Sequence, residues 1–140
     1  MVGGEISRSN GPLHGIRVLD LTRVLAGPWA SQVLGDYGAE VIKVERPETG
    51  DDTRHWGPPW RDDWEGRKTK DSAYFLSANR NKRSITIDLS NPAGAGLLRD
   101  LASKCDVLME NFRVGTMRRF ELGYEAVSYT HLTLPTILLV

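Results

Sequence analysis

The chain has 140 residues, of which 40% are apolar and 26% charged, as in an ordinary globular protein of about one domain. Eighteen basic residues balance eighteen acidic ones, which argues against a general nucleic-acid or anionic-membrane binder. The single cysteine, Cys105, excludes an internal disulfide and suits a reducing compartment, and no apolar run approaches the roughly 20 residues of a membrane-spanning helix.

Residues 1–11 carry no recognisable targeting signal. They lack the apolar stretch of a secretory signal and are too short and too poor in arginine for a transit peptide. We therefore expect a flexible N-terminus on a protein of the mitochondrion or cytoplasm.

The first structured segment has the pattern of a βαβ unit. Residues 16–22 are β-branched and leucine-rich, which predicts a buried strand. After a loop over residues 23–27, Pro28 favours the start of a helix and Gly38 its end. Residues 40–45 predict a second strand, which would pair in parallel with the first through a right-handed crossover.

Residues 46–71 differ in character. Their charges balance, prolines and glycines interrupt any periodicity, and Trp56, Trp60 and Trp64 are spaced along the segment. Loops of this length are uncommon in a compact domain unless they are functional or contact a partner, and disordered segments are poor in aromatic residues. We predict an ordered, irregular loop that packs on another part of the protein.

The rest of the pattern alternates strands and helices, which indicates an α/β protein with a Rossmann-like open parallel sheet. We expect a short helix at 72–78, a strand at 84–88, a helix from Pro92 capped by Ser90 or Asn91, a strand at 106–109, and a last helix through Met117 to Gly123.

Ligands of open α/β sheets bind beyond the carboxyl ends of the strands. The residues that we place there include many arginines, and the amide groups of the helix at Pro28 add positive potential. This rim comprises Arg23 to Gly27, Arg46, Arg80, Lys82 and Arg83 just before the third strand, Leu89 and Ser90 after it, Asn111 to Arg113, Arg118 and Arg119. The combination fits a multiply phosphorylated ligand, for which arginine offers forked contacts.

Ordinary structural interpretations remain open for these residues. The arginines are also typical of solvated loops, Phe112 of a core or hinge position, and the tryptophans of packing anchors. We expect Cys105 to be buried and unreactive, and we predict no metal site, because the three histidines are scattered without partners at ligand spacing.

A dinucleotide-binding domain is a further alternative, since Glu45 ends the second strand where an acid that binds ribose would lie. The first loop lacks the G-x-G-x-x-G pattern, however, and Val24 and Leu25 would block the close approach of a pyrophosphate. We therefore disfavour NAD chemistry.

Five blocks of sequence resemble the family III CoA-transferases (the formyl-CoA and carnitine CoA-transferase group) in order and spacing over residues 12–127. These blocks are GIRVLDLTRVLAGP (15–28), GAEVIKVERP (38–47), GDDTR (50–54), NRNKRSI (79–85) and DVLMENF (106–112). Together with DDTRHWGPP at 51–59, they are most similar to the succinyl-CoA:glutarate (dicarboxylate) branch.

The resemblance implies a Rossmann-like large domain, an interlocked homodimer, and acyl-CoA and a small carboxylate as substrates. From the composition and the histidine spacing we expect no metal, nucleic acid or membrane partner. The resemblance also implies coenzyme A contacts at Val24, Leu25, Ala26, Arg46, Ile87, Asp88, Leu89, Ser90, Asn111, Phe112, Arg113 and Arg119. Formyl-CoA transferases carry His and Gln at the positions of Arg23 and Leu25, and Gly at that of Arg113, which puts formyl or oxalyl specificity in doubt.

The family's catalytic aspartate, which carries the acyl group and then CoA, belongs to a region beyond residue 140. Residues 127–140 hold no Lys, Arg, Asp or Glu, and the segment resembles a translated sequencing-adapter tail. We expect residues 128–140 to be non-native and the chain to be an inactive N-terminal part of a CoA-transferase. The alternatives are a free-standing CoA- or nucleotide-binding fragment, or a fragment that does not fold alone.

Overall fold

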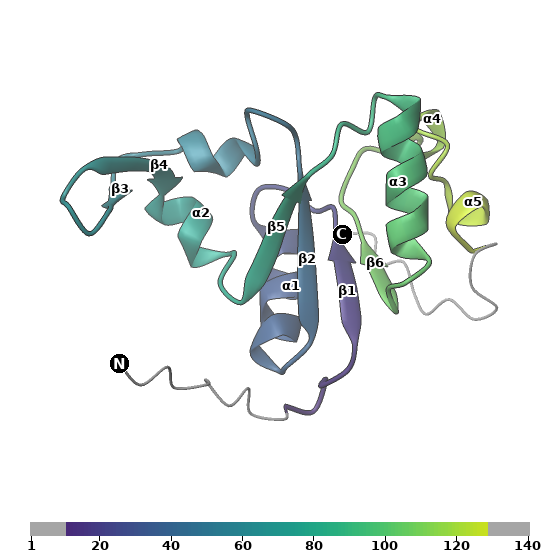
Figure 1. The fold of residues 1–140 in the computed structure, drawn as a ribbon, viewed down its shortest axis with the longest axis horizontal. Coiled ribbons are helices and arrows are strands. Elements are labelled where there is room, and N and C mark those ends of the chain that lie inside the picture. Colours follow the sequence, from purple (N-terminus) through teal and green to yellow (C-terminus); the bar gives the residue numbers. More distant parts are fainter. Residues whose placement is uncertain (1–10, 129–140) are drawn as a thin grey trace.

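The computed structural model describes residues 11–128 and contains a four-stranded parallel sheet (Figure 1). The strands lie in the order β5-β2-β1-β6, with β1 at Arg17–Asp20, β2 at Glu40–Glu45, β5 at Lys82–Thr86 and β6 at Val107–Met109. In order of occurrence within this sheet, these are strands three, two, one and four, as in half of a Rossmann fold. The expected α/β fold class is confirmed.

Two helices cover opposite faces of this sheet. Helix α1 (Ala26–Asp36) crosses from β1 to β2 behind the sheet in Figure 1, and α3 (Pro92–Ala102) lies in front of it. Asn91 caps α3 by accepting the amide of Ala93 at 2.9 Å, as one of the two expected caps. Helix α1 begins two residues earlier than predicted, so that Pro28 is its third residue.

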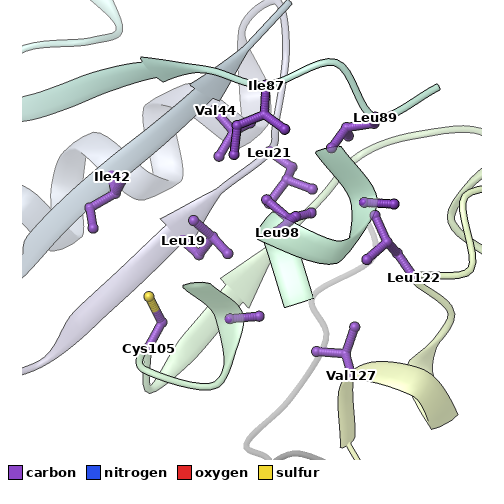
Figure 2. Close-up of a cluster of buried hydrophobic side chains, with 12 residues drawn as sticks. Leu19, Leu21, Ile42, Val44, Ile87, Leu89, Leu98, Cys105, Leu122 and Val127 are labelled. Carbon is purple, nitrogen blue, oxygen red and sulfur yellow. The ribbon is translucent and has the colours of Figure 1, made fainter. Parts of the chain in front are cut away.

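The face under α3 is packed with aliphatic side chains. Leu19 from β1 and Ile42 and Val44 from β2 meet Leu98, which is completely buried (Figure 2). Side chains alternate between the two faces of a strand, so every second residue of β1 and β2 contributes to this core. The leucine stripe predicted for α3 therefore has its partner in the sheet.

The face under α1 is different. Val18 and Val41 supply a small apolar cluster, but Asp20 and Lys43 lie on the same face and are also fully buried. Every buried side-chain nitrogen or oxygen among residues 11–128 has a hydrogen-bond partner. This face therefore holds a satisfied polar network.

The segment after β2 contains more regular structure than expected. It forms a 3-10 turn, η1 (Asp52–His55), and an antiparallel hairpin of β3 (Trp60–Asp62) and β4 (Lys68–Ser72), which leads into α2 (Ala73–Ser77). Ser72 accepts the Phe75 amide at 3.0 Å and donates its hydroxyl hydrogen to the Thr53 carbonyl at 2.5 Å. The cap of α2 thus also fastens the hairpin to η1.

The last predicted helix is wrong in its extent. The structure has a short α4 (Thr116–Arg119) and a separate α5 (Tyr124–Ser128), because Glu121 has a positive φ of 56° that ends the first helix. Leu122 between them is buried in the α3 core. Residues 1–10 and 129–140, which include nearly all of the expected tail, lie outside the described residues. Within residues 11–128, no helix has the length and apolar character to cross a bilayer.

Candidate functional site

The loops after β1 and β6 meet at the point where the sheet changes its direction of growth. The chain runs from β1 to β2 on one side, and β6 is added on the other side of β1. The Asn111 side chain accepts the backbone N–H of Arg23 at 2.9 Å and donates to its carbonyl at 2.9 Å. This reciprocal pair joins the two loops where doubly wound sheets bind ligands.

The Arg23 guanidinium lies over the ring of Phe112, 4.7 Å from its centroid. Burial is the largest cause that lowers the pKa of Arg23, and the charge of Arg46 lowers it further, although Asp52 and Asp51 oppose this. A partly desolvated cation beside a second cation favours an anionic ligand, whose negative charge would offset both the cost of burial and the repulsion between the two cations.

The start of α1 is held in an unusual conformation. Val24 has a φ of +71°, which costs a β-branched residue about 1–3 kcal/mol and persists only where neighbouring groups enforce it. Leu25, next to it, keeps 41% of its surface exposed, and Ala26 is also exposed. Since Ala26 and Gly27 open the helix, their amides have no partner within it.

Gly27 allows the start of α1 to lie close against Thr22, because a Cβ at position 27 would lie 2.4 Å from Cβ of Thr22. The helix therefore starts against the end of β1 only if this position lacks a side chain.

The other residues expected to bind coenzyme A are less uniform. Arg46 pairs with Asp52, and its Nε donates to the Gly50 carbonyl at 3.3 Å, so its charge is partly neutralised. Arg113 and Arg119 are exposed, and neither pairs with a carboxylate of residues 11–128.

The segment after β5 turns its side chains in opposite directions. Ile87 and Leu89 are buried in the α3 core, and the backbone N–H of Ile87 donates to the Glu45 carbonyl at 3.0 Å. Asp88 and Ser90 are exposed, and the Asp88 carboxylate accepts the amide and hydroxyl hydrogens of Ser90 at 2.9 and 2.6 Å.

The inclusion of Arg80, Lys82 and Arg83 in the rim is wrong. Residues that precede a parallel strand lie at the opposite edge from the carboxyl ends, and Lys82 indeed pairs with Val41 near the start of β2. Arg80 pairs with Asp36 at the end of α1, and Arg83 pairs with Glu40. The rim is therefore less basic than expected.

Lys82 instead turns its ammonium beneath α1. It lies 3.1 Å from Oδ2 of Asp20 and donates to the Pro28 carbonyl at 2.8 Å and to the Asn79 side chain at 2.9 Å. Burial is the main cause that lowers the pKa of Lys82 to about 8, although Asp20 opposes it. Lys82 is therefore part of the buried network and is not available at the rim.

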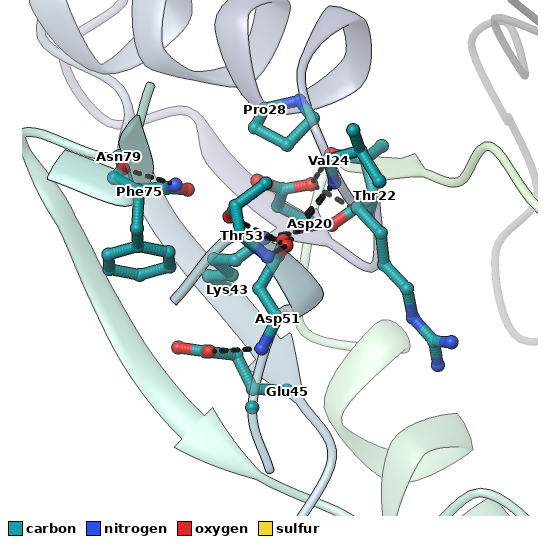
Figure 3. A network of polar contacts seen from close by, with 12 residues as sticks. Asp20, Thr22, Val24, Pro28, Lys43, Glu45, Asp51, Thr53, Phe75 and Asn79 are labelled. Atoms are coloured by element: carbon teal, nitrogen blue, oxygen red, sulfur yellow. Dashed lines mark hydrogen bonds and ion pairs between the residues drawn. The ribbon is translucent and has the colours of Figure 1, made fainter. Parts of the chain in front are cut away.

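A second buried ion pair, which the sequence reasoning missed, lies below the loop after β1 (Figure 3). Nζ of Lys43 is 3.0 Å from Oδ2 of Asp51, and both side chains are 1% exposed. The same ammonium donates to the Thr22 carbonyl at 2.8 Å. The available signal was Lys43 itself, because a charged residue between Ile42 and Val44 in a strand covered on both faces needs a buried partner.

Glu45 does not present its carboxylate to a ligand. It is 5% exposed and accepts hydrogen bonds from Arg54 at 2.7 Å, from Ser84 at 2.5 Å and from the amide of Asp51 at 2.9 Å. Burial alone would raise the pKa of Glu45, but these donors outweigh it and lower the pKa to about 2. The dinucleotide alternative therefore lacks its ribose-binding acid.

Cys105 is buried and forms no disulfide, as predicted. Burial is the main cause that raises the pKa of its thiol, which disfavours the reactive thiolate. No group of three or more His, Cys, Asp or Glu side chains that could hold a metal ion occurs within residues 11–128.

The fold defines an α/β protein with a candidate ligand site at the switch point of a doubly wound sheet. Residues 13–134 match the sequence profile of CoA-transferase family III, and the chain belongs to this family. It is 53% identical to the succinyl-CoA:glutarate CoA-transferase of Mus musculus over 116 residues, which are 83% of this chain and 25% of the relative. It is 52% identical to the succinate–glutarate CoA-transferase of Agrobacterium fabrum over 83% of this chain and 29% of that protein.

A solved structure of a CAIB/BAIF family protein from Brucella suis superimposes with a TM-score of 0.81 at 47% identity, over 93% of this chain and 32% of that chain. The chain thus spans about a quarter of the length of the curated relatives it matches. The family match ends at residue 134 and so includes part of the segment that we expect to be non-native.

Proposed function

We propose that this chain is the CoA-binding part of a CoA-transferase that moves coenzyme A between an acyl-CoA thioester and a small dicarboxylate such as glutarate. The observation that carries the proposal is the 52–53% identity to relatives that are named for succinyl-CoA and glutarate. The site adds physical support, because two loops joined at the switch point present cations and an exposed apolar side chain together.

Coenzyme A combines three phosphate groups with an adenine ring and an uncharged pantetheine arm that carries both amide and methyl groups. Arg23 and Arg46 offer positive charge at the end of the sheet, and Arg113 and Arg119 are exposed near the loop after β6. Leu25 exposes apolar surface on the adjoining loop. In this proposal the arginines bind phosphates and the loop after β1 contacts the adjoining part of the ligand.

Binding is tested by calorimetric titration of the folded chain with CoA and with dephospho-CoA. We expect saturable binding of CoA, and the double variant Arg113→Ala/Arg119→Ala to bind it about tenfold more weakly. Arg80→Ala is the matched control, because it removes an exposed arginine from the opposite edge of the sheet. The proposal fails if the folded chain binds neither ligand, or if Arg80→Ala weakens binding as much as the double variant.

We further propose that the nucleophilic aspartate, the acceptor pocket and the interlocked dimer belong to parts of the protein outside residues 1–140. In support, the chain covers 25% of the mouse relative, and the family resemblance places the aspartate later in the sequence. The purified chain is expected to show no exchange of CoA between succinyl-CoA and glutarate. Turnover above that of a heat-killed control would contradict this expectation.

The alternative that the chain does not fold alone has its own observation. Trp29 in α1 and Tyr37 directly after it are each 54% exposed, and Trp64 is 88% exposed, so large apolar side chains lack cover within residues 11–128. A cooperative thermal transition in monomeric protein would exclude this alternative. Its absence would mean that binding must be measured in a longer chain.

A further inference from the structure

We propose that Asp51 is a positioning residue that holds the backbone of residues 22–26, named here the CoA loop, in the conformation that binds the ligand. The proposal rests on the proposed function, because the importance of this loop for CoA comes from there. Asp51 is not among the residues expected to contact CoA. Its proposed role is to fix the backbone conformation of the loop.

Asp51 reaches the CoA loop from a distant part of the sequence. It lies in the turn between β2 and η1, 27 positions from Val24 along the chain. The backbone N–H of Val24 lies 3.4 Å from Oδ1 and 3.3 Å from Oδ2 of Asp51, so it is shared by both oxygens. Figure 3 shows Asp51 between the side chains of Lys43 and Thr53 and the main chain of Val24.

The remaining contacts of the carboxylate fix its orientation. Oδ1 accepts the Thr53 amide at 3.0 Å and the Thr53 hydroxyl at 2.8 Å, and Oδ2 faces Lys43 at 3.0 Å. Burial would raise the pKa of Asp51, but Lys43 and Thr53 lower it, so the group is ionised. An ionised carboxylate is required because every neighbour is a donor, and an amide would place its own N–H groups against one of them.

The ion pair controls both peptide units that flank Arg23. Asp51 holds the N–H of Val24, while its partner Lys43 holds the carbonyl of Thr22 at 2.8 Å. The Asn111 side chain holds the N–H and carbonyl of Arg23 itself. Groups from three separate places in the sequence therefore fix consecutive peptide units, which explains how a valine is kept at a φ of +71°.

The consequence is a preorganised loop. A loop that is already held in its binding conformation loses less conformational freedom when the ligand binds, so affinity falls if the restraint is removed. Asp51 would thus influence CoA binding from a buried position, since only 1% of its side chain is exposed.

The test compares Asp51→Asn with Leu98→Ala, a buried substitution on the opposite face of the sheet, at temperatures equally far below their unfolding midpoints. We expect Asp51→Asn to weaken CoA binding about tenfold and to increase hydrogen exchange of the Val24 amide about tenfold, as measured by NMR. Leu98→Ala should leave the CoA affinity and the exchange rate of the Val24 amide near their wild-type values, because it removes no contact of the CoA loop.

The two proposals can fail separately. If the wild-type chain binds no CoA, the proposed function fails, while exchange of the Val24 amide still tests the positioning role. If the wild type binds CoA and Asp51→Asn leaves both readouts unchanged, the positioning role alone is wrong. If Asp51→Asn does not fold, Thr53→Ala removes one donor from the carboxylate and should shift both readouts in the same direction by a smaller factor; unchanged values would overturn the proposal.

Discussion

The two faces of the central sheet are built on different principles. The face under α3 packs Leu19, Ile42 and Leu98 into an aliphatic core, whereas the face under α1 buries Lys43 and Asp51 as an ion pair. Apolar burial is non-directional, but a buried charge needs each partner at hydrogen-bond distance. The comparison suggests that the first face supplies stability and the second fixes the geometry of the candidate site.

The largest effect is expected on the charged face. Lys43→Met leaves the Asp51 carboxylate buried without its cation and should lower the free energy of unfolding by about 3–5 kcal/mol. Urea unfolding followed by circular dichroism measures this loss. Adding Asp51→Asn should recover part of it, because the unpaired charge is then removed, and a double variant less stable than Lys43→Met would contradict the ion-pair interpretation.

A slightly smaller loss is expected on the apolar face. Leu98→Ala removes a completely buried side chain from the α3 core and should cost about 3–4 kcal/mol in the same measurement. Its NMR spectrum should retain the wild-type Val24 amide resonance. A displaced Val24 resonance would show that packing under α3 also changes the conformation of the loop after β1.

Glu45 provides a test by pH. Its pKa of about 2 in the folded chain lies below the usual 4.5, so the ionised carboxylate stabilises the fold above pH 4.5, and this contribution is lost as the pH falls towards 2. Relative to Glu45→Gln, the wild type should lose about 3 kcal/mol across this window. Urea unfolding at several pH values measures the difference. If the free energy of unfolding changes with pH in the same way for both proteins, the predicted contribution of Glu45 is wrong.

No measurable change in stability is expected from Arg80→Ala. This arginine is exposed at the far edge of the sheet, where its pair with Asp36 is screened by solvent. A thermal midpoint clearly below that of the wild type would show that the Arg80–Asp36 pair contributes to stability and would contradict this expectation.

The sequence predicted those features that depend on local pattern. The apolar runs located the four parallel strands, and Asn91 with Pro92 marked the start of α3. The sequence placed Arg23 and Asn111 beyond the carboxyl ends of two strands, and the structure joins the two residues there.

The remaining features depend on contacts between distant segments. The partners of Lys43 and Glu45 are Asp51 and Arg54 in a segment that was expected to be irregular. The positive φ of Val24 results from restraints imposed by several parts of the chain, and no local signal distinguishes it. The misplaced cations had a local signal, since Arg80 precedes β5 and Lys82 and Arg83 are its first two residues, but their carboxylate partners could not be inferred.

The most direct test of the account is a map of backbone amide shifts in an NMR titration of the folded chain with CoA. We predict saturable shifts at residues 23–26 and 111–113, where the two loops are joined, and unchanged resonances at residues 80–83 on the opposite edge. Shifts concentrated at residues 80–83, or no saturable change anywhere, would contradict it.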